Sequence, residues 1–320
     1  MSLNDKISGK EIILGVAILA VVAIGMFMTV RAFKTEGEQK AYAISEKGDK
    51  NPNHVDANVK LLTIDAIKGD ATARIEFVPN GNLLAGDGNL ATDIKFFINS
   101  ANGKQEIDFK KGKRMTPVEA VIDMYEGNVS EYPFDQHKAL VEIELTPGKS
   151  DEKKPAEKPA GTGQDHADAG DEHADSKKES AEPEDLSISV DFFGSIPGYK
   201  IAAATRAETD ENYVAFDIEI DRSSTAVFFS TFVAILMWGL SIAVLFLVLS
   251  IVVRKRKPEI AMFSYMAALL FAFYAVRNSQ PNVPPIGVFS DFVSFFWAEI
   301  IVAGCLFVGT FTWIFRPNKT

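Results

Sequence analysis

The stretch AVFFSTFVAILMWGLSIAVLFLVLSIVVRKRK, residues 226–257, decides the fold. Its first part, residues 226–253, carries no charged side chain. A run of about 20 mostly apolar residues is long enough to cross the hydrocarbon layer of a bilayer. Its last part, residues 254–257, is purely basic, and basic loops stay on the cytoplasmic side of a membrane. The stretch therefore predicts a membrane span that ends at the cytoplasmic face.

Three further apolar runs are long enough to cross a bilayer, at residues 12–30, 260–276 and 292–315. The first of them is longer than the apolar part of a secretory signal peptide, so we expect an uncleaved anchor. Together with residues 226–253, these runs predict four transmembrane helices, one N-terminal and three C-terminal.

The basic cluster also orients the four predicted spans. If residues 254–259 form a cytoplasmic loop, the other segments must alternate between the two sides. We therefore expect a multi-pass protein of the bacterial inner or plasma membrane with both termini in the cytoplasm. The expected cytoplasmic ends are residues 1–11 and 316–320, and the expected external segments are residues 31–225 and 277–291.

The large external segment is rich in short alternating stretches that predict β-strands. Turns at Gly69-Asp70 and at Asn102-Gly103 each join two such stretches into a hairpin. The alternation is clearest in KALVEIEL, residues 138–145, and in YVAFDIEIDRS, residues 213–223. Seven to nine short strands without an intervening helix predict an antiparallel β-sandwich of immunoglobulin-like type.

Residues 147–185 interrupt this pattern with a stretch rich in Asp, Glu, Lys, Ala and Pro. Such a composition buries too little apolar surface to offset the cost of ordering, so we expect a disordered acidic insert. His166 and His173 lie among its carboxylates and are the candidates for a metal site in the external segment. We expect a solvated linker rather than a metal site, and no cofactor.

Glu299 is the only charged residue inside any of the four apolar runs. A carboxylate in hydrocarbon is costly and marks a functional or structural role. Arg277, at the outer end of the preceding run, is the expected partner, and Asn278 and Asp291 are polar residues of the same external loop. Three roles stay open for Glu299: a structural ion pair, an ion or proton path, and a contact with a partner helix.

The segment YPFD, comprising Tyr132, Pro133, Phe134 and Asp135, resembles the membrane-facing loop of pentameric ligand-gated channels. We expect it to form a membrane-proximal loop in which Phe134 fills the sandwich base or touches the bilayer. The order of spans differs from that of those channels, because one span precedes the sandwich here and three follow it.

A longer resemblance is carried by YPFD and by LLFAFYAVRNSQPNVPPIGVFSDFVSFFWAE, residues 269–299. Both segments are similar to an uncharacterised bacterial four-span membrane protein family, domain of unknown function 4436. The resemblance implies an anchor, an external sandwich and three further spans, and it draws attention to Glu299. It implies no activity.

The composition limits the classes of function. The formal charge of −10 argues against nucleic-acid binding, and the sequence contains no GxSxG, HExxH or P-loop motif, so we expect no enzyme. The expected partners are the lipid bilayer and a protein partner or further copies of the chain. The predicted role is an envelope interaction or accessory subunit. The alternatives are a channel or transporter component using Glu299, and a metal-handling protein using the His/Asp insert.

Overall fold

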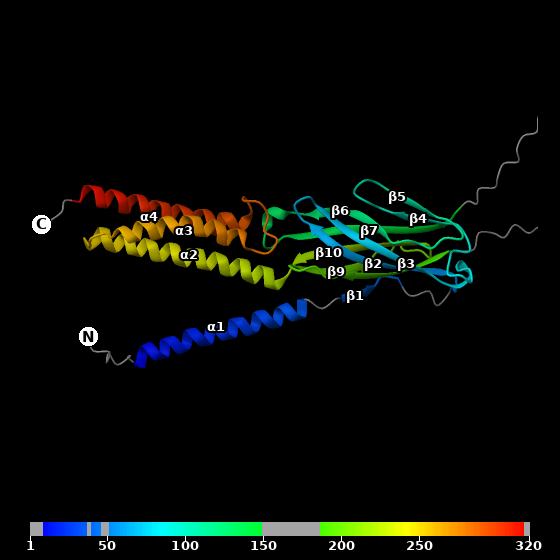
Figure 1. Cartoon of the computed structure of the whole chain (residues 1–320), viewed down its shortest axis with the longest axis horizontal. Helices are drawn as coiled ribbons and strands as arrows, with labels where there is room; N and C mark the ends of the chain where they lie inside the picture. The colour runs from blue at the N-terminus through cyan, green and yellow to red at the C-terminus, as the bar shows by residue number, and fades with distance from the viewer. Residues whose placement is uncertain (1–8, 37–39, 46–50, 149–185, 317–320) are drawn as a thin grey trace, which may run out of the picture.

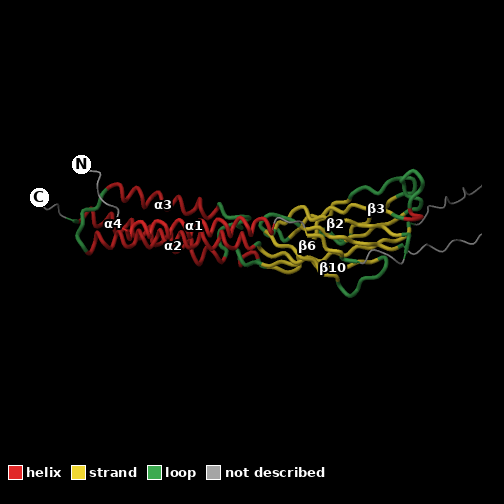
Figure 2. Tube along the Cα trace, turned by 90° about the horizontal axis from the view of Figure 1, so that it is seen from below, coloured by secondary structure: helices red, strands yellow, loops and turns green. Residues whose placement is uncertain are grey.

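A computed structural model describes residues 9–36, 40–45, 51–148 and 186–316. The molecule is elongated, with a sheet-rich domain at one end and helices at the other (Figures 1 and 2). The first and last described residues both lie at the helical end, far from the sheet domain. Residues 149–185 fall outside the described ranges, so the predicted disorder of the insert and its candidates His166 and His173 stay predictions.

The helices correspond to the predicted apolar runs. They are α1 (Gly9–Glu36), α2 (Ser224–Val253), α3 (Ile260–Asn278) and α4 (Phe296–Phe315), the last preceded by the π-helical turn η3 (Asp291–Phe295). Among the described residues, three helical segments are long and apolar enough to cross a membrane: Ser224–Val253, Ile260–Asn278 and Asp291–Phe315. Helix α1 approaches α2 near the sheet domain and diverges from it toward the N-terminus (Figure 1).

The sheet domain contains ten strands within the described ranges. They are β1 (Lys40–Ala43), β2 (His54–Asp65), β3 (Asp70–Pro79), β4 (Ile94–Ile98), β5 (Gln105–Phe109), β6 (Val118–Gly127), β7 (Gln136–Pro147), β8 (Ser187–Gly194), β9 (Tyr199–Thr205) and β10 (Tyr213–Arg222). Two short 3₁₀ turns, η1 (Gly81–Leu83) and η2 (Val129–Glu131), lie between them. The strand order is β1-β8-β2-β3-β6-β7-β10-β9, with β4 pairing with β5 and β7. Strand β6 pairs with β3 on one side and with β7 on the other, so it joins the two layers.

The predicted alternation builds the core between the layers. In β7, Ala139, Val141, Ile143 and Leu145 are fully buried. The four apolar residues of β10 on the same side, Val214, Phe216, Ile218 and Ile220, are buried as well. Both predicted hairpins form, as the β2–β3 and β4–β5 pairs.

The prediction of a purely antiparallel sheet is wrong at one pair, because β2 and β8 run parallel. A parallel pair needs a long crossover connection, and the chain between Asp65 and Ser187 supplies it. This parallel pairing brings the end of β2 and the end of β8 to the same end of the sandwich, next to the helices (Figure 1).

Candidate functional site at the base of the sandwich

The base of the sandwich, where the sheet domain meets the helices, is held by the connector between α3 and α4, residues 279–290. Tyr132 Oη donates a hydrogen bond to the Pro281 carbonyl at 3.1 Å, and the Ser290 amide donates to the Tyr132 carbonyl at 3.3 Å. Asn282 Nδ2 donates to the Pro197 carbonyl at 3.2 Å. The predicted membrane-proximal loop and the predicted external loop, far apart in sequence, are therefore packed against each other.

The turn between β8 and β9, which meets the connector, contains Gly198 in a backbone conformation that favours glycine. Gly198 has φ +87°, and a Cβ placed there would lie 2.8 Å from Asn282 Nδ2. A side chain at this position would strain the backbone and displace the Asn282 amide from its hydrogen bond to Pro197.

Arg222 is the central residue of the base. It is the last residue of β10, and the next residue, Ser223, caps α2 by accepting a hydrogen bond from the Ala226 amide at 3.1 Å. The strand thus enters the helix without a linker, and this direct transition leaves Arg222 only 6% exposed. A buried guanidinium must be paired and hydrogen-bonded to be tolerated.

Asp135 supplies the paired charge. Arg222 Nε donates to both carboxylate oxygens, at 2.9 and 3.0 Å, and Arg222 Nη1 donates to the Asn282 carbonyl at 3.3 Å. The guanidinium lies 4.9 Å from the ring centre of Tyr132 and 4.6 Å from that of Tyr199. Both rings offer the negative face of their π-systems, which adds cation–π stabilisation to the ion pair.

His137 completes the network from the start of β7. Its Nε2 lies 2.9 Å from Asp135 Oδ2, and both side chains are buried. An ionised carboxylate can only accept hydrogen bonds, so Nε2 carries the proton and donates. Burial on its own would raise the pKa of Asp135, but the hydrogen bonds from His137 and Arg222 outweigh it and leave this pKa below its usual range. Asp135 is therefore an ionised carboxylate that is buried at the junction between the sandwich and the helices.

A second ion pair fixes the connector itself. Arg277 Nε and Nη2 donate to the two oxygens of Asp291 at 2.8 and 2.7 Å. The remaining donors of Arg277 reach the carbonyls of Pro284 and Pro285 and the Asn278 side chain. Asp291 also accepts hydrogen bonds from the amides of Gly287 and Val288. The predicted pairing of Arg277 with Glu299 is wrong, because Asp291 and the proline carbonyls satisfy the guanidinium completely.

Glu299 lies on α4, on the edge of the buried stripe formed by Ala298, Val302 and Cys305. Its side chain is half-buried and forms no hydrogen bond or ion pair with any of the described residues. The structure thus separates the predicted polar set. Arg277, Asn278 and Asp291 lie together, and Glu299 stands apart from them.

The YPFD segment differs in detail from the prediction. Tyr132, and not Phe134, fills the base, since Tyr132 is fully buried and Phe134 is 56% exposed. Phe134 instead meets Phe289 of the connector edge to face, with ring centres 6.4 Å apart. Asp135 bonds to the side chains of His137 and Arg222 across the base.

The sequence reasoning missed the two partners of Asp135. It left His137 without a role and did not single out Arg222. One signal was present: Arg222 is the only Lys or Arg in residues 207–253. A basic residue just before an apolar run is also typical of a residue that anchors a span at the membrane interface. The signal therefore does not distinguish such an anchor from a buried partner of Asp135.

The base network is suited to holding elements together and to recognising charge, rather than to covalent chemistry. Within the described ranges, no three His, Cys, Asp or Glu side chains gather as a metal site requires. Asp135 and His137 form an acid–base pair, but both are enclosed and bonded to each other, and Asp135 is also bonded to Arg222.

The central ion pair predicts a large stability effect. Arg222→Met leaves Asp135 as an uncompensated buried charge, which costs about 3–5 kcal/mol. We expect that loss in chemical unfolding of the full chain in mild detergent. The matched control is Arg206→Met, which removes a two-pronged pair with Asp217 whose side chains are 37% and 24% exposed. This control should cost about 1 kcal/mol or less, and equal losses in the two variants would contradict a buried central pair.

The lowered pKa of Asp135 predicts an acid-dependent stability. The folded-state pKa lies below the ordinary value of 3.8, so Asp135 contributes its full stabilisation of the folded state at a pH above 3.8. This stabilisation is lost as the pH falls through the folded-state pKa, when the carboxylate protonates. We expect Asp135→Asn to reduce stability at neutral pH and to flatten its fall in acid, measured as Tm against pH. If the Tm of Asp135→Asn fell with pH as steeply as that of the wild type, other carboxylates would be responsible for the loss of stability in acid.

Comparison with known protein families gives two matches, which meet at the end of β10. Residues 222–316 match the family described as Domain of unknown function (DUF8686), and residues 45–220 match the family described as Domain of unknown function (DUF4436). No curated protein matches the chain. The second match covers more than half of the 320 residues and includes the YPFD segment. Residues 269–299, the longer segment on which the resemblance to DUF4436 rested, fall in the DUF8686 match instead. The chain belongs to the family of the domain of unknown function DUF4436.

Proposed function

We propose that this protein is an accessory or interaction subunit of a bacterial inner or plasma membrane, with α4 as its contact for a partner helix. The observation that carries the proposal is Glu299, a half-buried carboxylate on a membrane-length helix with no partner among the described residues. The proposed topology has four spans, both termini in the cytoplasm, and an external sandwich of immunoglobulin-like character.

The surface of the helices supports their placement in lipid. Large apolar side chains point outward along them, and a bilayer is the solvent in which such a surface is stable. Examples are Phe228, Ile235, Phe246, Phe271, Phe307 and Phe311. On α1, Ile13 and Leu19 are exposed in the same way, so we place α1 in the membrane as the N-terminal span.

The position of the basic residues supports the proposed orientation. The cluster at residues 254–257 follows α2 at the end of the helices that is remote from the sandwich. At the same end, Arg316 Nη1 donates to the Arg256 carbonyl at 2.7 Å. Basic residues gathered at one end favour that end as the cytoplasmic one, which leaves the sandwich outside.

A carboxylate within the hydrocarbon needs a donor, and the described chain provides none for Glu299. Arg277, the cation that the sequence predicts as its partner, is bound to Asp291 instead. A helix of a second chain, either another protein or another copy, can supply a hydroxyl, amide or cationic donor to this edge of α4. Because the base network fixes the last hairpin to the sandwich, a partner bound at α4 is held in a defined position relative to the external domain.

The alternative of a channel or transporter component loses support from the same contacts. It needs Arg277, Asp291 and Glu299 along one path, and the first two are enclosed in the connector. The metal-handling alternative depends on residues 165–175, which lie outside the described ranges, and it stays a prediction.

Glu299→Gln tests the proposal through the mass of the complex extracted in mild detergent. We expect the wild type to elute as a stoichiometric complex heavier than the 35.0 kDa chain. Loss of one intramembrane hydrogen bond costs about 1–2 kcal/mol, so association should weaken roughly five- to thirtyfold. The matched control is Thr310→Ala, an exposed polar position on the same helix whose hydroxyl bonds to its own backbone. A single-chain mass in the wild type, or an unchanged complex in Glu299→Gln, would contradict the proposal.

A further inference from the structure

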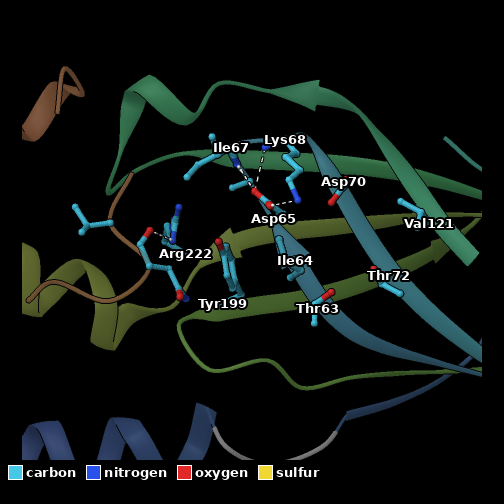
Figure 3. Close-up of a pocket in the computed structure, with 13 residues that line it drawn as sticks. Thr63, Ile64, Asp65, Ile67, Lys68, Asp70, Thr72, Val121, Tyr199 and Arg222 are labelled. Carbon is cyan, nitrogen blue, oxygen red and sulfur yellow. Dashed lines mark hydrogen bonds and ion pairs between the residues drawn. The ribbon is translucent and has the colours of Figure 1, made fainter. Parts of the chain in front are cut away.

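A cavity of about 520 Å³ opens beside the base network, between the β2–β3 turn and Arg222 (Figure 3). The turn contributes three charged side chains to its wall, Asp65, Lys68 and Asp70. Tyr199 and Arg222 form the opposite wall, and Asn282 also lines the cavity. We call this space the base cavity.

A second cavity of about 350 Å³ adjoins it, and Tyr199 and Asn282 line both. Its wall is mainly apolar and is formed at the sandwich ends of α1 and α2. The apolar contributors are Phe33, Ile196, Pro197, Ala226 and Pro281. We call this space the apolar cavity. A polar space and an apolar space that share one wall suit an amphiphilic molecule.

The base cavity contains charges of both signs that the protein does not fully use. Lys68 Nζ lies 3.2 Å from Asp65 Oδ2, whereas the Asp70 carboxylate accepts no hydrogen bond from the described residues. With Arg222 included, the wall carries two positive and two negative side chains. The groups of this wall left without a hydrogen-bond partner among the described residues are Arg222 Nη2 and the Asp70 carboxylate, so a molecule that carries both an acceptor and a cationic donor matches it.

Arg222, which lines the base cavity, has one guanidinium nitrogen without an acceptor among the described residues. The Tyr132 and Tyr199 rings cover its faces, Nε is bonded to Asp135, and Nη1 is bonded to Asn282. Nη2 is buried and has no acceptor among the described residues. Buried donors without an acceptor are costly, so an acceptor group that reaches Nη2 would be bound.

We propose that the two cavities bind a zwitterionic lipid whose headgroup carries a phosphate and a primary ammonium. The phosphate is the acceptor for Arg222 and Lys68, and the ammonium donates to Asp70. The start of the acyl region lies in the apolar cavity. The inference rests on the membrane placement proposed above, and it is independent of any partner at Glu299.

A lipid is favoured over a soluble ligand by the position of the cavities. Both are lined by residues at the end of the sandwich from which the helices enter the proposed bilayer. Ile67, at the tip of the β2–β3 turn, is 60% exposed, and Phe134 and Phe289 are also exposed at this end. Exposed apolar and aromatic side chains at the level of the headgroups are typical of contact with a membrane interface.

Native mass spectrometry of the full chain in mild detergent tests the proposal by titration with three lipids. They are phosphatidylethanolamine, phosphatidylcholine, which lacks ammonium N–H donors, and phosphatidylglycerol, which lacks the cation. We expect phosphatidylethanolamine to bind most tightly. Asp70→Asn should weaken its binding roughly tenfold, the value of one charge-assisted hydrogen bond. Asp108→Asn, a half-exposed carboxylate on β5 that lines neither cavity, should leave it unchanged.

Soluble phosphoethanolamine and the variant Ser195→Trp distinguish a lipid from a free headgroup. Ser195 is an exposed residue of the apolar cavity, so tryptophan there should crowd acyl chains and weaken phosphatidylethanolamine alone. Equal affinities for phosphatidylethanolamine and phosphatidylcholine would overturn the proposal, as would an Asp70→Asn variant with wild-type lipid binding. Phosphoethanolamine binding as tight as that of the lipid would assign the site to a soluble ligand instead. A loss of the heavier complex in Glu299→Gln has no bearing on any of these results.

Discussion

A buried positive charge at the point where a strand becomes a helix constrains this whole molecule. Arg222 ends β10, and α2 begins two residues later, so the guanidinium cannot reach bulk water. It has to be neutralised in place, and Asp135, which lies just before β7 and is bonded to His137, does so. Because breaking such a pair leaves an uncompensated buried charge, the loop before β7 and the start of α2 are obliged to stay together.

The connector between α3 and α4 extends this constraint to the last hairpin. It offers backbone carbonyls to the base, with Pro281 bonded to Tyr132 and Asn282 bonded to Arg222. Its own shape is fixed by Arg277 and Asp291. The sandwich and the hairpin therefore form one continuous polar network across the proposed membrane surface. Glu299 lies outside this network, which is why we assign it to a partner, and the base cavity lies at its edge, which is why we assign it to a ligand.

Local patterns were enough to predict most elements, because apolar runs and period-two alternation report directly on burial. The helical runs, both hairpins and the buried faces of β7 and β10 were predicted in this way. Strand β6 was not predicted, although its buried residues Val118, Ala120 and Ile122 alternate with more exposed ones. Strand β1 was not predicted either, because four residues are too few to show a pattern. The site was predicted in part. Tyr132, Asp135, Arg277 and Asp291 were named, but their partners depend on strand pairing over long separations, and no local pattern encodes the contact between Asp135 and Arg222 across 87 residues.

The most direct test of the account is the distance between the sandwich and the last hairpin in a bilayer. Spin labels at Ala101→Cys and Thr310→Cys, both exposed positions, can be placed in a Cys305→Ala background, which removes the only native cysteine. Double electron–electron resonance in nanodiscs then reports the distribution of that distance. A fixed joint predicts one narrow distribution that broadens when Arg222→Met is added. A broad or multiple distribution in the protein with Arg222 intact would contradict a rigid connection between the sandwich and the helices.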